Sequence, residues 1–398
     1  MSSSPYYAEI FHRLYAEDSL RDSPRLREAL ERLPGLPVHW VPDKNGIPPE
    51  HSHLHTLWVC RPRGNTVTRC PGSHGHLCCG YLTVDLYLGC PLGCRYCIMR
   101  SYLNFSPITV YLDPGPSIER LVSIARRNPD RVIRAGTGEV GDSLLLDPAF
   151  RLSECFVRAL AGYPNLYFEM KTKTSCVDHL LDVPQKGNAV IGFSLNPQEI
   201  VDACEGIAAG LEERLAAAER AVAAGYLLSF HFDPLILFPA WRDSYRELAQ
   251  RLLRFPPERI AWISLGTMRY PPELKDTLDA QATRDAQATP VTQVTLDAQV
   301  TPVTQDTLDA QATPADLSPD IGERLFLEEF VPCQDGKHRY LQKTRSAMYR
   351  HLLTALEPLH GVPVYLCMES PSVWRNVFGT LPGKKPSTRG IFEAIRDV

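Results

Sequence analysis

The sequence predicts an α/β fold built on a parallel sheet, and three observations support this prediction. Strand-like and helix-like runs alternate six times after residue 81, which favours parallel strands joined by right-handed crossovers. The first run, 82–88, is rich in Val, Leu and Tyr, which suits a buried strand. The chain of 398 residues is long enough for two average domains, or for one α/β barrel with additions.

Each element is expected from its own local pattern. The predicted strands are 82–88, 131–135, 165–170, 189–195, 226–232 and 259–265. Among the helices between them, Ser117 is the expected N-cap of 118–127, and Gly225 is placed to end the Ala-rich helix 211–224. Near the C-terminal end, a helix is expected over 337–356 and a strand over 363–368.

Composition divides the chain into four segments. Residues 1–80 form an N-terminal extension with a Cys-rich stretch, 81–276 hold the strand–helix units, 277–320 are a repeat insertion, and 321–398 complete the barrel domain. The insertion repeats every twelve residues, as in TLDAQVTPVTQD, and has no aromatic residue. Such a segment buries too little apolar surface to offset the entropy of ordering it. A disordered insertion is therefore expected, and a small β-solenoid is the alternative.

Charge and cysteine usage predict a protein of a reducing, cytoplasmic compartment. The formal net charge of −4 gives no overall attraction to polyanions. Twelve cysteines in a chain of this length do not form the pattern of a disulfide framework. The N-terminal residues lack a signal-peptide pattern, and no run approaches the ~20 apolar residues of a membrane span, so no membrane partner is expected.

Three cysteines in one short loop carry the main functional prediction. Cys90, Cys94 and Cys97 follow the first strand at the spacing C-x3-C-x2-C, in CPLGCRYCIMRSYLN. Thiolates bind iron–sulfur clusters and zinc, which usually take four protein ligands. Three thiolates leave one position open, and an open position is where a metal performs chemistry. A zinc knuckle completed by a distant fourth ligand is the alternative.

With the aromatic residue Tyr96 before its third cysteine, this loop resembles the cluster motif of the radical S-adenosylmethionine (SAM) enzymes. The resemblance implies a 4Fe-4S cluster on the three cysteines, SAM as cofactor at the fourth iron, and a partial (β/α)6 TIM-like barrel. The runs TKTSCVDHLL, GFSLNP and SFHFDPLI resemble the spore photoproduct lyase family, a DNA-repair branch of that superfamily. A nucleic acid is therefore the expected substrate class, and an external flavodoxin- or ferredoxin-like electron donor is expected as a partner.

Polar groups follow every predicted strand, and the carboxyl ends of barrel strands meet at one rim. Glu139 follows the second strand in a glycine turn, where a carboxylate suits the SAM ammonium group. Lys173, Ser194 and Asn196 follow the third and fourth strands, and the resemblance implies that these three bind SAM. Their structural alternatives are a solvent-facing acid for Glu139 and turn residues for Ser194 and Asn196. The remaining strand ends carry His231, Asp233 and Arg269.

The loop after the second strand departs from the family pattern. The lyases have a cysteine there as a hydrogen-atom donor, whereas this chain has Glu139 at that position in GTGEVGDSLLLD. The sequence thus predicts a lyase-like radical SAM enzyme that does not finish the lyase reaction in the usual way. The alternative is a non-catalytic iron–sulfur protein for electron transfer or redox sensing, which would need the cluster but not the SAM contacts.

A second group of cysteines precedes the first strand, together with two histidines. Its irregular spacing and adjacent pair do not suit one tetrahedral metal site, so we expect these thiols to behave as small hydrophobic groups. The group consists of Cys60, Cys70, His74, His76, Cys78 and Cys79.

Overall fold

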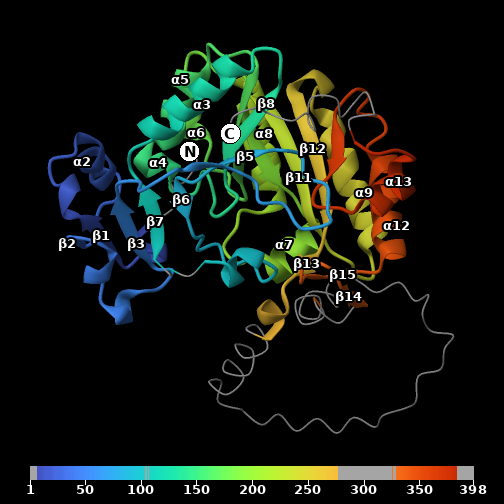
Figure 1. Cartoon of the computed structure of the whole chain (residues 1–398), viewed down its shortest axis with the longest axis horizontal. Coiled ribbons are helices and arrows are strands. Elements are labelled where there is room, and N and C mark those ends of the chain that lie inside the picture. Colours follow the sequence, from blue (N-terminus) through green and yellow to red (C-terminus); the bar gives the residue numbers. More distant parts are fainter. Residues whose placement is uncertain (1–6, 104, 106, 277–324, 326–328, 383–398) are drawn as a thin grey trace, which may run out of the picture.

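A curled sheet of eight strands forms the body of the protein (Figure 1). The computed structural model describes residues 7–103, 105, 107–276, 325 and 329–382. Along the sheet the order is β16-β12-β11-β10-β9-β8-β5-β4, parallel from β16 to β5, with β4 antiparallel at the edge. The predicted α/β fold with a partial barrel is confirmed. Its strands are β4 (Val67–Arg69), β5 (Leu82–Val84), β8 (Ile133–Thr137), β9 (Leu166–Thr172), β10 (Ala189–Ser194), β11 (Leu227–Leu235), β12 (Ile260–Thr267) and β16 (Val364–Leu366).

Three strands of the N-terminal extension and two that flank the cysteine loop build a second sheet beside the barrel, in the order β2-β1-β3-β7-β6 (Figure 1). The predicted single strand 82–88 is wrong, because it divides into β5 of the barrel and β6 of this second sheet. Between them the Asp85 amide bonds to the carbonyl oxygen of Thr66 at 2.9 Å. The cysteine loop therefore follows β6 of the second sheet and not the barrel strand β5. The second sheet consists of β1 (Arg13–Glu17), β2 (Val38–Val41), β3 (Thr56–Cys60), β6 (Tyr87–Leu88) and β7 (Ile108–Tyr111).

A small antiparallel sheet joins the two sides of the repeat insertion. In it β15 (His338–Tyr340) pairs with both β13 (Arg269–Tyr270) and β14 (Phe330–Pro332). The predicted helix over 337–356 is wrong at its start, because this stretch begins with β15 and becomes helical only at α12 (Gln342–Ala355). The predicted strand over 363–368 is present as β16. The predicted insertion, 277–320, lies outside the described residues.

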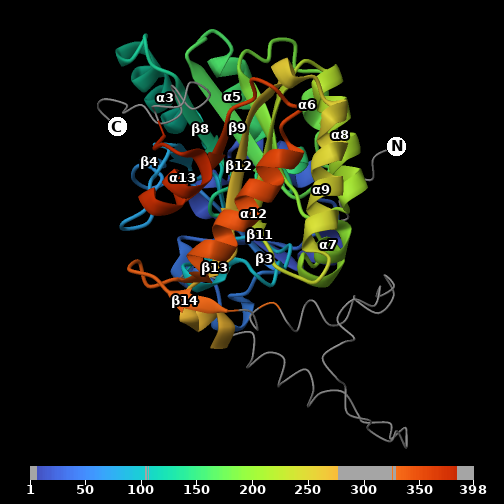
Figure 2. The same cartoon turned by 90° about the vertical axis from the view of Figure 1, so that its right-hand side faces the viewer.

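Helices cover the outer face of the curled sheet. Helix α8 (Leu211–Ala223) packs against β10 and β11, and α12 packs against β12 and against α9 (Trp241–Arg251). Figure 2 shows α8, α9 and α12 on one side of the sheet. Ser117 lies inside α3, which begins at Gly115, so its predicted N-cap role is wrong; its hydroxyl bonds to Thr66 instead. No helix among the described residues is long and apolar enough to cross a membrane. The remaining helices are α1 (Tyr7–Ile10), α2 (Pro24–Glu31), α3 (Gly115–Arg127), α4 (Asp147–Phe150), α5 (Leu152–Leu160), α6 (Asp178–Leu181), α7 (Gln198–Cys204), α8 (Leu211–Ala223), α9 (Trp241–Arg251) and α13 (Pro371–Phe378).

The strands turn apolar side chains toward the helices and polar side chains toward the barrel interior. On β9, Phe168 stacks on Phe156 of α5, with ring centroids 4.5 Å apart. The next residue, Glu169, points to the opposite face, as strand geometry requires. It is fully buried and accepts hydrogen bonds from Tyr81 at 2.7 Å and from His231 at 2.6 Å. The barrel interior is therefore a polar network that leads to the strand ends.

The Cys-rich stretch spans the open side of the half-barrel. Its Leu77 pairs with Glu369 just after β16, and the Cys70 amide bonds to Tyr81 just before β5. Within this stretch the Cys79 sulfur accepts a hydrogen bond from the buried Arg134 at 2.8 Å. In the part of the chain that the structure describes, no three His, Cys, Asp or Glu side chains are arranged to hold a single metal ion. The stretch thus connects two edges of the sheet.

Candidate functional site

A pocket of about 440 Å³ lies at the carboxyl ends of the barrel strands. It collects the cysteine loop and polar groups from five of the strands, as the rim argument predicted. Of the predicted SAM contacts, Asn196 lies behind this pocket while the other three line it. The lining groups that the sequence pattern singled out are Cys90, Cys94, Tyr96, Cys97, Glu139, Lys173, Ser194, His231, Asp233 and Arg269.

The cysteine loop is fixed against the turn that follows α7. The Arg95 amide bonds to the Cys204 carbonyl oxygen at 2.8 Å, and the Ile207 amide bonds to the Leu92 carbonyl oxygen at 2.9 Å. Between these contacts, Gly206 has a φ of +57°, and a Cβ built there would lie 2.2 Å from the Leu92 oxygen. Only glycine permits this close approach. The turn therefore sets the position of the loop on the pocket wall.

A buried network supports the loop from behind. Glu205 is fully buried, accepts from Asn196 at 3.0 Å, and also bonds to Tyr96 and Arg214. Tyr245 donates to the Asn196 side-chain oxygen at 2.8 Å. Burial alone would raise the pKa of Glu205, but the Arg214 charge lowers it, so this carboxylate is ionised. The geometry gives Asn196 a positioning role, and its direct contact with SAM stays a prediction.

A lysine beside the cysteines favours the ionised form of Cys94. Burial raises the pKa of Cys94 to about 12, and the charge of Lys173 opposes this effect. Burial would lower the pKa of Lys173, but Glu205 and Cys94 raise it, so the ammonium group remains charged. Its nitrogen lies 5.6 Å from the centre of the Tyr96 ring. Three free thiols next to a fixed cation suit an anionic cluster, which holds each thiolate on a separate iron.

The same pocket carries an ion pair that the strand-end pattern did not predict. Glu139 bonds to Lys171, which lines the same pocket from β9. Burial would lower the pKa of Lys171, but the charge of Glu139 raises it. The neighbouring Asp142 accepts from the Lys173 amide at 2.8 Å and so ties the loops after β8 and β9 together. The signal was available, because Lys171 stands two residues before Lys173 at the end of β9, and residues two apart in extended chain share a face.

The far end of the pocket is closed by side chains that already have partners. Arg269 holds Asp233 through two hydrogen bonds of 2.8 and 3.2 Å. The ring nitrogens of His231 lie 2.6 Å from Ser264 and 2.6 Å from Glu169. His231 and Asp233 are therefore not bonded to each other, and each is held by a residue from another strand.

Comparison with known proteins gives a consistent family. Residues 79–265 match the family model described as spore photoproduct lyase. The spore photoproduct lyase of a Geobacillus species is 30% identical over 175 residues, which cover 43% of this chain and 50% of the relative. The Bacillus subtilis spore photoproduct lyase is 26% identical over 168 residues, which cover 41% and 48%. The chain thus spans about half the length of the curated relatives it matches.

The likeness in structure extends beyond the likeness in sequence. A spore photoproduct lyase complexed with the dinucleoside spore photoproduct matches with a TM-score of 0.67 and 18% identity, over 90% of this chain and 98% of that chain. A variant of the lyase with bound AdoMet and the same photoproduct also matches with a TM-score of 0.67, at 17% identity and the same coverage. At this level of identity the match shows that the fold is shared.

Proposed function

We propose that the whole chain is a lyase-like radical SAM enzyme acting on a nucleic acid, because residues 79–265 match the spore photoproduct lyase family model. The observation that carries this proposal is one pocket lined by three cysteines, Lys173 and the Glu139–Lys171 pair. The solved relative with bound AdoMet and a dinucleoside lesion supports both the cofactor and the substrate class.

In this proposal Cys90, Cys94 and Cys97 hold a 4Fe-4S cluster. When bound, the cluster would supply the electron that cleaves SAM reductively to methionine and a 5′-deoxyadenosyl radical. Lys173 offsets the negative charge of the thiolates and offers a donor to the SAM carboxylate. Glu139 offers an acceptor to the SAM ammonium group.

The Glu139–Lys171 pair also bears on the outcome of the reaction. A carboxylate in an ion pair has no O–H bond, so Glu139 is not a hydrogen-atom donor in place of the family's cysteine. We therefore expect little or no repair of the spore thymine lesion by the wild-type protein, with the radical acting on another nucleic-acid substrate. Product analysis with a lesion-containing dinucleotide checks this, and efficient multiple-turnover repair would contradict it.

The partner and the compartment follow from the same chemistry. An external flavodoxin- or ferredoxin-like protein would supply the electron for the cleavage of SAM. All twelve cysteines are free thiols, which suits a reducing, cytoplasmic compartment.

SAM cleavage is the experiment that tests the function. The protein is prepared without oxygen, its iron content is measured, and 5′-deoxyadenosine is quantified after addition of SAM and a strong reductant. We expect cleavage by the wild type and by Cys155→Ala, a matched thiol outside the pocket lining, and none by Cys94→Ala. Iron without SAM cleavage would favour the electron-transfer or sensing alternative, and zinc without iron would favour the zinc knuckle.

A further inference from the structure

The ammonium group of Lys171 has a single acidic partner in the strand-end pocket. Lys171 lies near the end of β9, lines the pocket and is 19% exposed at its side chain. Its ammonium group carries three N–H donors. Among the described residues, Glu139 is its one hydrogen-bond acceptor, and its nitrogen lies 5.3 Å from the centre of the Tyr81 ring. Two of the three donors therefore have no acceptor in the described part of the chain.

The turn before Glu139 holds this pair in place. Gly138 has a φ of +92°, and a Cβ built there would lie 2.7 Å from the Lys171 carbonyl oxygen. Only glycine permits so close an approach. The same carbonyl oxygen accepts a hydrogen bond from the Ser143 amide at 3.0 Å. The loop that carries Glu139 is thus held against the backbone of Lys171 at two points.

The other acidic side chains that line the pocket have partners of their own. Asp233 accepts two hydrogen bonds from Arg269, at 2.8 and 3.2 Å. Asp142 accepts from the Lys173 amide at 2.8 Å. Neither acid bonds to Lys171, so its direct ion pair is with Glu139 alone among the residues that the structure describes.

The charge balance of this pair depends on what Glu139 binds. In the proposed function, Glu139 accepts a hydrogen bond from the SAM ammonium group. Its one negative charge would then face two ammonium groups, so Lys171 would carry an uncompensated charge on the pocket wall. Burial would lower the pKa of Lys171, but Glu139 and Glu169 raise it. Because Glu169 is fully buried, it is out of reach of SAM and continues to stabilise the charged form of Lys171.

We propose that Lys171 binds a phosphodiester group of the nucleic-acid substrate, and that it does so more tightly once SAM has engaged Glu139. This inference rests on the proposed function and adds to it a substrate-binding residue and an order of binding. An uncompensated ammonium group with two unused donors gives phosphate oxygens charge-assisted hydrogen bonds. Because coupling free energies are reciprocal, the substrate should tighten the binding of SAM by the same factor.

The test measures binding and not turnover. The cluster-loaded protein is kept without a reductant, so that SAM is not cleaved. Thymidylyl-thymidine, a dinucleotide with one phosphodiester group, is titrated by calorimetry with and without saturating SAM. We expect the wild type to bind it about tenfold more tightly with SAM, the effect of one charge-assisted hydrogen bond. Thymidine, which has no phosphate, should show no such dependence.

Two substitutions should remove this dependence in opposite ways. Lys171→Gln should bind the dinucleotide weakly with and without SAM, because the charged donor is lost. Glu139→Gln should bind it tightly in both states, because the Lys171 charge is then uncompensated throughout. The SAM concentration is raised for Glu139→Gln until its weaker site is saturated. A merely structural role of the pair would weaken binding in both variants.

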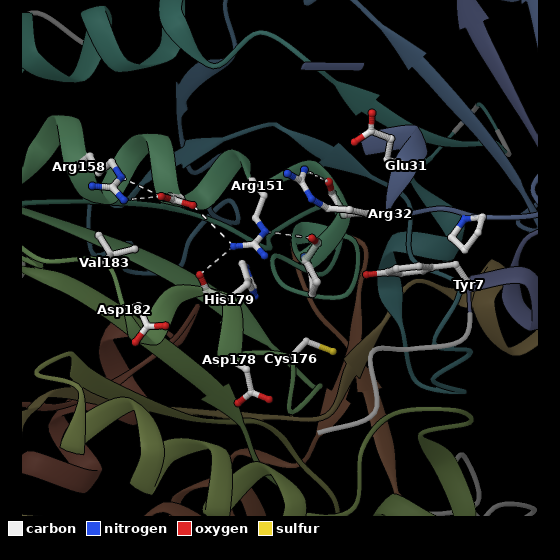
Figure 3. Close-up of a pocket in the computed structure, with 14 residues that line it drawn as sticks. Tyr7, Glu31, Arg32, Arg151, Arg158, Cys176, Asp178, His179, Asp182 and Val183 are labelled. Carbon is white, nitrogen blue, oxygen red and sulfur yellow. Dashed lines mark hydrogen bonds and ion pairs between the residues drawn. The ribbon is translucent and has the colours of Figure 1, made fainter. Parts of the chain in front are cut away.

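The matched control is an ion pair in a second cavity (Figure 3). This cavity, of about 800 Å³, is lined by residues of α2, α5 and α6 and shares no lining residue with the strand-end pocket. There Arg158 bonds to Glu154 at 2.7 Å. Arg158→Gln should therefore show the same dependence on SAM as the wild type.

The possible failures are distinct. The inference is overturned if the wild type does not bind the dinucleotide, if it binds equally with and without SAM, or if Lys171→Gln keeps the full dependence. Binding of inorganic phosphate but not of the dinucleotide would also overturn it, since the ligand would then be a free anion. If the wild type does not bind SAM, the proposed function itself fails. If Lys171→Gln does not fold, weak binding by Glu139→Gln without SAM overturns the inference.

Discussion

Two acid–base pairs flank the cysteine loop, and they differ in their exposure to water. Behind the loop, Glu205 and Arg214 are both 0% exposed at their side chains. Across the pocket, Glu139 is 31% exposed and Lys171 is 19% exposed. Breaking a sealed pair leaves an unpaired charge in the interior, whereas a pair on a pocket wall can exchange its partner for a ligand. The Glu205–Arg214 pair therefore suits a role in positioning the loop, whereas the Glu139–Lys171 pair is accessible to a ligand.

The largest expected effect comes from removing one of the three cysteines that are proposed to bind the cluster, because neither ion pair can replace a thiolate ligand. Each of Cys90→Ala, Cys94→Ala and Cys97→Ala should abolish both iron binding and SAM cleavage, because a three-cysteine site has no spare thiolate. Iron analysis and the 5′-deoxyadenosine assay measure the two losses. One such variant with full iron and full activity would refute the assignment of the loop.

Matched controls come from the second group of cysteines. Cys60→Ala, Cys70→Ala and Cys78→Ala should each leave the SAM-cleaving cluster in place, since none of these residues lines the strand-end pocket. Loss of the cluster in any of them would indicate a wider metal assembly.

The next effect separates the two pairs by stability. Glu205→Gln should lower the free energy of unfolding by about 3–5 kcal/mol, because it leaves the Arg214 charge buried and unpaired. Glu139→Gln should cost about 1 kcal/mol or less, since its pair is partly solvated. Urea denaturation of both variants measures this difference. Equal losses would mean that the burial of the pair does not determine its role.

Acid should distinguish the buried pair in a second way. The pKa of Glu205 is lowered in the folded protein: burial raises it, but Arg214 lowers it further. Its contribution to stability is therefore fully present above the pKa of an unfolded glutamate, about 4.3, and is lost as the pH falls through the lower folded value. The stability of Glu205→Gln should fall less steeply with acid below pH ~4 than that of the wild type. Parallel curves would show that this pair does not contribute to acid sensitivity.

For the exposed pair, the expected effect is on binding. Glu139→Gln should weaken SAM binding by about tenfold, because one charge-assisted hydrogen bond to SAM is lost. The iron content should stay normal. Equilibrium dialysis with SAM measures the change. Loss of iron in this variant would show that the pair supports the cluster loop after all.

The smallest expected effect concerns the predicted repeat insertion. Excision of 278–312 should leave the melting temperature within a few degrees, because loop-closure entropy changes only with the logarithm of length. The described strands that precede and follow the segment, β13 and β14, both pair with β15. Aggregation of the deletion variant, or a large drop in melting temperature, would contradict this.

Local patterns were enough to predict the fold and several polar groups of the pocket lining. The cysteine spacing, the alternation of strands with helices and the polar residues after each strand are all short-range features. Because the carboxyl ends of parallel strands meet at one rim, the polar residues after each strand are expected to lie close together. Glu139, Lys173 and Ser194 were found in this way, and the structure brings them to one pocket with the three cysteines.

Pairing across long distances in the sequence was decided only by the tertiary structure. Local sequence does not say that Glu205 joins Arg214 and Asn196 behind the loop, or that Glu139 takes Lys171 as its partner. The same reason explains why the predicted strand 82–88 divides between two sheets. Hydrophobic periodicity tells which face of an element is buried, but the partner on that face is chosen by packing, where each buried charge must find its counter-charge.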